Sequence, residues 1–461
     1  MYSSTATLHH ELDGRIGLYR AGFLSPRMLQ LDVNYDVLFR PTAITPIRDM
    51  ALEELQSRYL LLGLQNGSIQ LLDVVDRASV DGQESHRIIG IIGKSSEQAR
   101  SSRPKVSDLR PVVCIQWYPV DSGLFFTASL DRTVKIWDTN RLTCADSIEL
   151  PSSISWIALS PCAIRHNLVA VALGADESAR SVLLDPVIGA AAITLIGGHS
   201  PAGLSSIVWS PRSSDTLVTA GHDGRILFWD IRLPTKPVHS LDRYGTHEDD
   251  GFTPDAAAHT GSVLSLAFTP DGLHLFSWGG AGTNEDTLCL RMWSAGPDEA
   301  GLKVVTNNTN LPGRPLLRPV NFGTVYADSG GSRDWNTSSD LGTAIGRITG
   351  VEIRSQSRTA SGAPWLSKRR IYAASRMAVV SGPPGEAWGA ESAFVYVPHR
   401  SRLFMAFAAK RKAQTQLVNR HYDKIRACIW NCEMRELYTC GMDGNLFTWQ
   451  FDPNVQDPSA L

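Results

Sequence analysis

IQWYPVDSGLFFTASLDRTVKIWD, at residues 115–138, is matched 92 residues later by IVWSPRSSDTLVTAGHDGRILFWD, at residues 207–230. Both segments contain an early Trp, then a Thr, an Asp and a closing Trp-Asp pair, all at the same spacing. A third, less complete copy occupies residues 429–449 and ends on a Trp. The offset of 92 residues corresponds to two units of 46, so the chain is built from a repeated unit.

A period of about 40–45 residues that ends in Trp-Asp is the signature of WD-repeat propellers, in which each unit forms one four-stranded blade. Weaker copies, in which Leu-Asp replaces Trp-Asp, end at Leu72-Asp73 and Leu184-Asp185. The repeats therefore predict an all-β fold, a seven-bladed WD-repeat β-propeller with a short N-terminal helical leader. Rigid propellers serve mostly as docking platforms, which favours binding over catalysis.

Each complete repeat carries four polar side chains that can form a buried hydrogen-bonded chain of carboxylate, imidazole, hydroxyl and indole N–H. The complete sets are His199, Thr219, Asp223 and Trp229, and His421, Thr439, Asp443 and Trp449. The incomplete sets are Thr127, Asp131 and Trp137, which lack the His, and His259, Ser277 and Trp293, where Asp286 lies seven residues before the Trp instead of six. Hydrolase triads use the same residue types, but here the hydroxyl lies on a strand and recurs with the repeat, so we expect no catalytic residue.

Composition narrows the class of protein further. The chain has 461 residues, is 43% hydrophobic and has a net charge of −2, which provides no field for direct nucleic-acid or membrane binding. Its seven Cys residues include no CxxC pair, which indicates reduced core residues and neither disulfides nor zinc ligands. No cofactor motif is present, the longest apolar runs have the length of a strand, and residues 1–13 contain no secretory signal. We therefore expect a non-catalytic protein without metal or cofactor.

The organisation along the chain follows from where apolar runs alternate with polar segments. We expect a helical leader at residues 1–30, a propeller at residues 31–451 and a tail at residues 452–461. The ring is expected to close through residues 28–33, because propellers hide their edge strands by pairing the two chain ends. Blade six is predicted to be split into residues 316–325 and 392–417, separated by a surface insertion at about 326–391 that is rich in Ser, Gly, Arg and Ala.

Several stretches resemble one particular family of WD-repeat proteins. Residues 115–142 contain WYP, DSG and WDTN, residues 208–232 contain SPR and GHDG, and residues 258–275 read AHTGSVLSLAFTPDGLHL. With these motifs in this order, the stretches resemble the Cockayne syndrome group A proteins, as do residues 394–398 and 435–449. The matching stretches span most of residues 27–451, and the insertion is the main departure.

This resemblance implies a substrate receptor of a cullin-RING ubiquitin ligase, located in the nucleus. Receptors of this family dock to the DNA damage-binding adaptor and act in transcription-coupled nucleotide-excision repair. Their further partners are a repair ATPase of the Cockayne syndrome group B type and, indirectly, stalled RNA polymerase II. The alternative from the repeats alone is a non-catalytic scaffold of another nuclear complex, in chromatin or RNA processing.

Two features carry the adaptor contact of that family over to this chain. The first is the box Trp229-Asp230-Ile231-Arg232 with Asp223 upstream, in which the Arg leaves a strand end and can reach a partner carboxylate or carbonyl. The alternative reading is a solvated strand-end Arg, common in any such blade. In the repeat at residues 115–138 the Arg is displaced by one position, to Arg141, which makes that copy doubtful.

The second feature is the leader. Leu12, Ile16, Tyr19 and Phe23 recur at spacings of three and four, which is typical of one apolar face of a helix. An apolar helical face without its own core favours a groove in a partner, here the adaptor, although the helix can also pack on its own propeller. With the adaptor on the face where third strands end, substrates or the repair ATPase are expected at loops 111–113, 200–204, 260–263 and 423–425 on the opposite face.

Overall fold

The computed structural model describes the segments that form the strands and the turns between them. The described residues are 31–34, 37–39, 45–80, 83–92, 111–162, 166–174, 180–242, 256–269, 272, 274–280, 287–294, 320–324, 353–354, 376–380, 394–399, 402–407, 414–417, 421 and 423–451. The predicted leader and tail, Asp286 and most of the predicted insertion lie outside them. Among these residues there is no helix long and apolar enough to cross a membrane.

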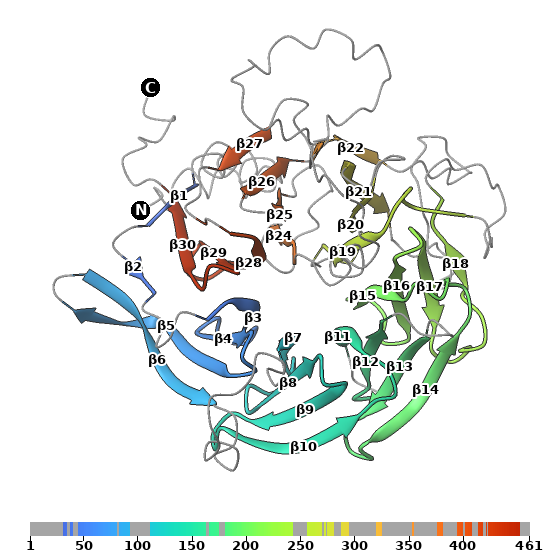
Figure 1. Ribbon diagram of the computed structural model, residues 1–461, viewed down its shortest axis with the longest axis horizontal. Helices are drawn as coiled ribbons and strands as arrows, with labels where there is room; N and C mark the ends of the chain where they lie inside the picture. The colour runs from blue at the N-terminus through green and yellow to red at the C-terminus, as the bar shows by residue number, and fades with distance from the viewer. Residues whose placement is uncertain are drawn as a thin grey trace, which may run out of the picture.

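The described strands form seven sheets arranged around a common centre, and their innermost strands are β3, β7, β11, β15, β19, β24 and β28 (Figure 1). The first four sheets in chain order are β3 (Ile47–Leu52), β4 (Tyr59–Leu64), β5 (Ile69–Val80) and β6 (Gln83–Ile92) with β2 (Val37–Leu38) beside β6; β7 (Val112–Trp117), β8 (Leu124–Ser129), β9 (Thr133–Asp138) and β10 (Thr143–Glu149); β11 (Ile154–Leu159), β12 (Val169–Leu173), β13 (Arg180–Asp185) and β14 (Ala190–Ile196); and β15 (Leu204–Trp209), β16 (Thr216–Gly221), β17 (Ile226–Asp230) and β18 (His239–Ser240).

The remaining three sheets complete the ring. They are β19 (Val263–Phe268), β20 (His274–Gly280), β21 (Thr287–Ser294), β22 (Val320–Thr324) and β23 (Ile353–Arg354); β24 (Ala378–Val380), β25 (Phe394–His399), β26 (Arg402–Phe407) and β27 (Gln414–Leu417); and β28 (Ile425–Asn431), β29 (Glu436–Gly441) and β30 (Leu446–Phe451) with β1 (Leu31–Val33).

The prediction of a propeller with seven four-stranded antiparallel blades is wrong. Six sheets are each built from one continuous stretch of chain, the remaining one combines both chain ends, and two sheets have five strands. One pairing, β2 with β6, is parallel rather than antiparallel. The described residues contain strands and turns and no helix, and the segment predicted as a helical leader is not among them. The repeat spacing specifies the strands that recur in each unit and says nothing about strands added at the outer edges.

The predicted split of blade six is also wrong. β22, which lies in the segment assigned to blade six, pairs with β21 and completes the preceding sheet. The innermost strand of the next sheet is β24, inside the predicted insertion, where it pairs with β25. Strands that follow one another along the chain usually pair, so β22 takes the open edge of β21 before the chain crosses to the next sheet.

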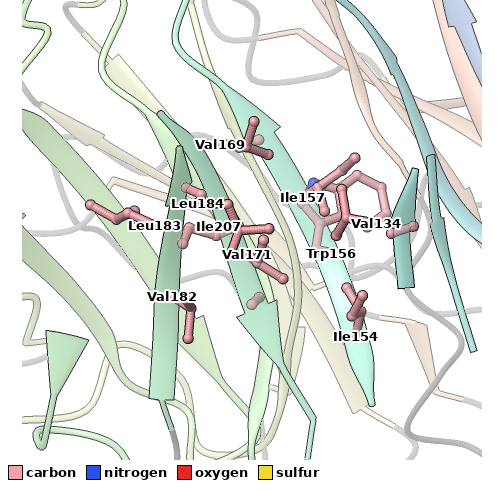
Figure 2. Close-up of a cluster of buried hydrophobic side chains, with 14 of the residues drawn as sticks. Val134, Ile154, Trp156, Ile157, Val169, Val171, Val182, Leu183, Leu184 and Ile207 are labelled. Carbon is pink, nitrogen blue, oxygen red and sulfur yellow. The ribbon is translucent and has the colours of Figure 1, made fainter. Parts of the chain in front are cut away.

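The core lies between neighbouring sheets, as Figure 2 shows for the sheets that contain β9, β11, β12, β13 and β15. β12 reads Val-Ala-Val-Ala-Leu and is buried along its whole length, because sheets cover it on both faces. Two Trp residues that end innermost strands fasten adjacent sheets: Trp117 Nε1 donates to the Ala51 carbonyl and Trp209 Nε1 to the Ala158 carbonyl, both at 3.0 Å.

The ring closes where the two ends of the propeller meet, and residues 31–33 of the predicted closing segment 28–33 take part. β1 pairs antiparallel with β30 over Leu31–Val33, and Asn34 Nδ2 donates to Gln450 Oε1 at 2.7 Å. A second contact joins the first sheet to the last: Arg77 Nη2 lies 2.6 Å from Glu436 Oε1, and the Glu436 side chain is 1% exposed. The closure therefore combines a backbone ladder with a buried ion pair.

Replacing Arg77 by Ala is expected to lower the free energy of unfolding by about 3–5 kcal/mol, because it leaves the Glu436 carboxylate buried without its positively charged partner. Denaturant unfolding measures the change. Arg87→Ala is the matched control, since the Arg87–Asp76 pair is exposed on both sides and its loss should cost less than about 1 kcal/mol. Equal effects of the two substitutions would contradict the role of the buried pair.

His86 makes the same junction sensitive to pH. Its Nε2 lies 2.9 Å from Thr448 Oγ1, and burial, together with the charge of Arg77, lowers the pKa of His86 from 6.5 to about 4. Between these values the unfolded chain binds a proton that the folded chain does not. The free energy of unfolding should therefore fall by about 3 kcal/mol as pH drops from 6.5 to 4.

The variant His86→Gln removes the titrating group and keeps a hydrogen-bonding side chain. We expect its stability to depend less on pH in this window than that of the unmodified protein, as measured by denaturant unfolding at half-unit steps. The same slope in both proteins would show that another group is responsible.

Candidate functional site

The two complete polar sets are each brought together as a hydrogen-bonded chain. In the last sheet, His421 Nδ1 lies 3.0 Å from both Asp443 oxygens, His421 Nε2 lies 3.0 Å from Thr439 Oγ1, and Trp449 Nε1 donates to Thr439 Oγ1 at 2.9 Å. Thr439 and Trp449 are fully buried. A proton on Nδ1 satisfies the carboxylate, which leaves Nε2 to accept from the hydroxyl. Every polar atom of this chain then has a partner.

The set in the sheet of β15–β18 has the same arrangement. His199 Nδ1 lies 3.2 Å from Asp223 Oδ1, His199 Nε2 lies 2.8 Å from Thr219 Oγ1, and Trp229 Nε1 donates to Thr219 Oγ1 at 2.8 Å. Asp223 Oδ2 also accepts from the backbone N–H of Ser200 at 2.8 Å. Burial alone would raise the pKa of Asp223, but the hydrogen bonds and charge of His199 outweigh it and hold the pKa below its ordinary value.

The incomplete sets keep the part of the chain that ends on Trp. Trp293 Nε1 donates to Ser277 Oγ at 2.8 Å and His259 Nε2 lies 2.7 Å from the same oxygen. Trp137 Nε1 donates to Thr127 Oγ1 at 2.8 Å with no His in the set. The hydroxyls of these sets lie on second strands inside the sheets, where they position the third-strand Trp and have no access to a substrate.

Asp443→Ala should lower the free energy of unfolding by about 1–3 kcal/mol, because it leaves His421 Nδ1 buried without a partner. Asp223→Ala should have an effect of the same size, and both are measured by denaturant unfolding. Asp146→Ala is the control, since Asp146 is exposed and its substitution should cost less than about 0.5 kcal/mol. Unchanged stability of both buried variants would contradict the role of these chains.

Arg232 lies on the face of the ring where third strands end. Its backbone N–H and its Nε both donate to Asp230 Oδ1, at 3.0 and 2.8 Å, and its Nη2 pairs with Asp230 Oδ2. The hydrogen bonds from Arg232 hold the pKa of Asp230 below its ordinary value. The Arg232 side chain is still 56% exposed, so its orientation is fixed while its remaining N–H groups face solvent.

Arg141, the displaced counterpart, is held much less firmly. Its Nε lies 4.0 Å from Asp138 Oδ2 and its side chain is 82% exposed. The box at Trp229–Arg232 therefore presents an oriented guanidinium, whereas the copy at Trp137–Arg141 presents a loosely held one. The leader residues Leu12, Ile16, Tyr19 and Phe23 lie outside the described residues, so their face stays a prediction.

The same face carries a feature that the motif analysis missed. Exposed large apolar side chains lie at the tips of the turns on the Arg232 face, in five of the sheets: Leu55, Val120, Val187, Ile188, Leu233 and Met434. Val187 and Ile188 are the most exposed, at 81% and 72%. The signal in the sequence was an apolar residue inside a turn, where polar residues are usual, as at Val120 and Val187. A face with many apolar tips around a fixed Arg is suited to contact with another protein.

A family model for the WD domain, G-beta repeat, matches residues 106–138 and 192–230, which contain β7–β9, most of β14 and β15–β17. The chain is a WD-repeat protein. In the described part, no group of three or more His, Cys, Asp or Glu side chains is placed to hold a metal ion.

Comparison with curated proteins adds three kinds of relative. The WD-repeat protein is 25% identical to the WD repeat-containing protein ATCSA-1 of Arabidopsis thaliana over 453 residues, which cover 94% of this chain and 92% of the relative. It is 33% identical to the ribosome biogenesis protein YTM1 of Phaeosphaeria nodorum, over 29% of this chain and 30% of that protein. It is 27% identical to radiation-sensitive protein 28 of Saccharomyces cerevisiae, over 29% of this chain and 26% of that protein.

Proposed function

We propose that this WD-repeat protein is the substrate-recognition subunit of a cullin-RING ubiquitin ligase that docks to the DNA damage-binding adaptor and acts in transcription-coupled nucleotide-excision repair. The observation that carries the proposal is the similarity to ATCSA-1 over nearly the whole of both chains. The motifs WYP, WDTN and FTPDGLHL support it, because they go beyond what WD repeats share in general. The proposed role is non-catalytic and nuclear.

The adaptor contact is assigned to the face with Arg232. Arg232 is held by Asp230 and keeps exposed N–H groups that suit a partner carboxylate or carbonyl. The apolar turn tips around it supply the contact area that one charged residue lacks. The apolar face of the leader, with Leu12 and Ile16, is proposed to fill a groove of the adaptor beside this surface.

The opposite face is proposed to receive the substrate or a repair ATPase of the Cockayne syndrome group B type, and RNA polymerase II indirectly. Its turns begin third strands, at Asp131, Asp223 and Asp443, and its loops enter the first strands. Opposite faces would allow both partners to bind at once, as a receptor requires.

A second candidate function is a scaffold in ribosome biogenesis, within the wider class of nuclear RNA-processing scaffolds. The local identity of 33% to YTM1 over 150 residues favours it. That match covers less than a third of either chain and lies in a protein built from repeats, so shared repeats account for it. The adaptor contact discriminates between the two candidates, because a plain scaffold has no need for it.

Deleting residues 1–23 should abolish co-purification of the DNA damage-binding adaptor, while the propeller stays folded because every described strand lies beyond residue 30. The measurement is affinity purification of the tagged protein, with thermal unfolding as a check on the fold. Full adaptor binding by the truncated protein would refute the role of the leader. A large fall in melting temperature would show that the leader packs on its own propeller.

Arg232→Ala should weaken adaptor binding by about tenfold, or about 1.4 kcal/mol, because one rim contact is lost while the apolar area remains. Arg141→Ala is the matched control and should leave the affinity unchanged, since Arg141 occupies a similar turn without a firm carboxylate partner. Titration of purified adaptor against each variant gives the comparison. Equal losses for the two variants would show that general surface charge, and not the Trp229–Arg232 box, is responsible.

A further inference from the structure

Six of the innermost strands share an irregularity near their start, on the face opposite Arg232. In six sheets the pairing of the first strand with the second skips its second residue. The skipped residues are Arg48, Val113, Ser155, Ser205, Leu264 and Arg426. A bulge of this kind re-aims the side chain of the extra residue, and such bulges recur beside binding and active sites.

Two of these six residues are arginines, and they belong to sheets that meet at the ring closure. Arg48 lies on β3 and Arg426 on β28, and the innermost strands of these sheets are neighbours in Figure 1. Arg426 is 8% exposed and Arg48 is more exposed than Arg426. Burial lowers the pKa of Arg48 to about 10 with a further contribution from Arg426, so the folded protein holds two like charges close together.

Among the described residues, the guanidinium of Arg48 does not find an acceptor for every N–H group. Its Nε is buried and has no hydrogen-bond partner among the described residues. Arg376, by contrast, has acceptors within the protein: its Nη1 donates to the Met50 carbonyl at 2.6 Å and lies 3.7 Å from Asp49 Oδ1. Asp49 is thus already engaged, since its other oxygen accepts from the backbone N–H of Ile115 at 2.9 Å.

Negative charges near Arg426 offset only part of the excess positive charge of the two arginines. Asp423, two residues before β28, favours the charged form of Arg426, as does Asp49. Burial is nevertheless the larger influence and lowers the pKa of Arg426. Arg48 gains no favourable charge contribution from any described residue and is opposed by Arg426. An added anion beside the two arginines would relieve this repulsion.

We propose that Arg48 and Arg426 form an anion-binding site at the centre of the face opposite Arg232, and that its ligand is a carboxylate side chain from an acidic segment of a partner protein. Guanidinium groups pair with carboxylates through two parallel hydrogen bonds, which suits an Asp or Glu presented by an extended segment. A nucleic-acid ligand fits less well, because the chain has a net charge of −2 and such ligands need many phosphate contacts.

This site rests on the proposal that a partner binds the face opposite the adaptor, and it supplies the chemistry of that partner. The site is built from two sheets that meet at the closure, so it exists only in the complete ring. If the anion-binding proposal is overturned, the proposed adaptor contact is unaffected, because Arg232 lies on the other face and is tested with the adaptor alone.

The test uses the full chain and two fluorescently labelled peptides, hexaglutamate and hexaglutamine, followed by fluorescence anisotropy at low salt. The unmodified protein should bind the Glu peptide at least about tenfold more tightly than the Gln peptide. Arg48→Gln should remove about tenfold of that preference, and Arg48→Lys should keep part of it because the charge remains. Arg87→Gln is the control, since Arg87 is an exposed Arg on outer strand β6 and its loss should change nothing.

Thermal unfolding separates a binding role from a structural one. Arg48→Gln removes a repulsion with Arg426, so its melting temperature should equal or exceed that of the unmodified protein. A lower melting temperature would show that Arg48 supports the fold, and would overturn the proposal. Equal binding of the two peptides, or an equal loss in Arg87→Gln, would overturn it as well. Tighter binding of a single-stranded oligonucleotide, with the same dependence on Arg48, would replace the protein ligand by nucleic acid.

Discussion

The antiparallel pairing of β1 with β30 is the constraint on which the rest of the structure depends. It joins residues from opposite ends of the propeller, Leu31 to Phe451 and Val33 to Trp449, and so covers the edge of β30 with a strand from the start of the chain. The sheet of β28–β30 then packs against the first sheet, where Ile47 and Met50 share a buried cluster with Ala427 and Tyr438. The same junction also encloses the Arg77–Glu436 ion pair, in which the Glu436 side chain is buried.

Polar side chains act within this closed ring as positioning elements. Each complete chain from Asp through His and Thr to Trp spans the turn before the first strand, the second strand and the third strand of one sheet. A third-strand Trp fixed in this way also fixes the end of its strand, where Trp229 leads directly to Asp230 and Arg232. The buried network thus has a consequence at the surface, because the orientation of an exposed Arg depends on a buried hydrogen-bonded chain.

The sequence predicted those parts of the fold that repeat. Trp137, Trp229, Trp293 and Trp449 mark third strands, and the run at 59–64 coincides with β4, because a blade needs these residues for its own packing. The strands it misassigned, β22 and β24, lie in segments without repeat markers, where an apolar run cannot show which edge it will join. The arginines of the central site were not recognisable either, because a bulge depends on the register between two strands. Arg48 reads as an ordinary strand residue until its pairing is known.

The two faces of the ring differ in the kind of contact they offer, and the strand pattern explains why. Turns on the Arg232 face are long enough to carry apolar tips such as Val120, Val187 and Met434, which suits a broad contact of moderate polarity. On the other face the short turns around Asp223 and Asp443 are tied down by their own carboxylates, which accept backbone N–H groups two residues on. Little side chain projects from such turns, so selectivity there has to come from residues nearer the centre. The bulges provide them, and the pair of arginines at the closure makes that centre selective for negative charge.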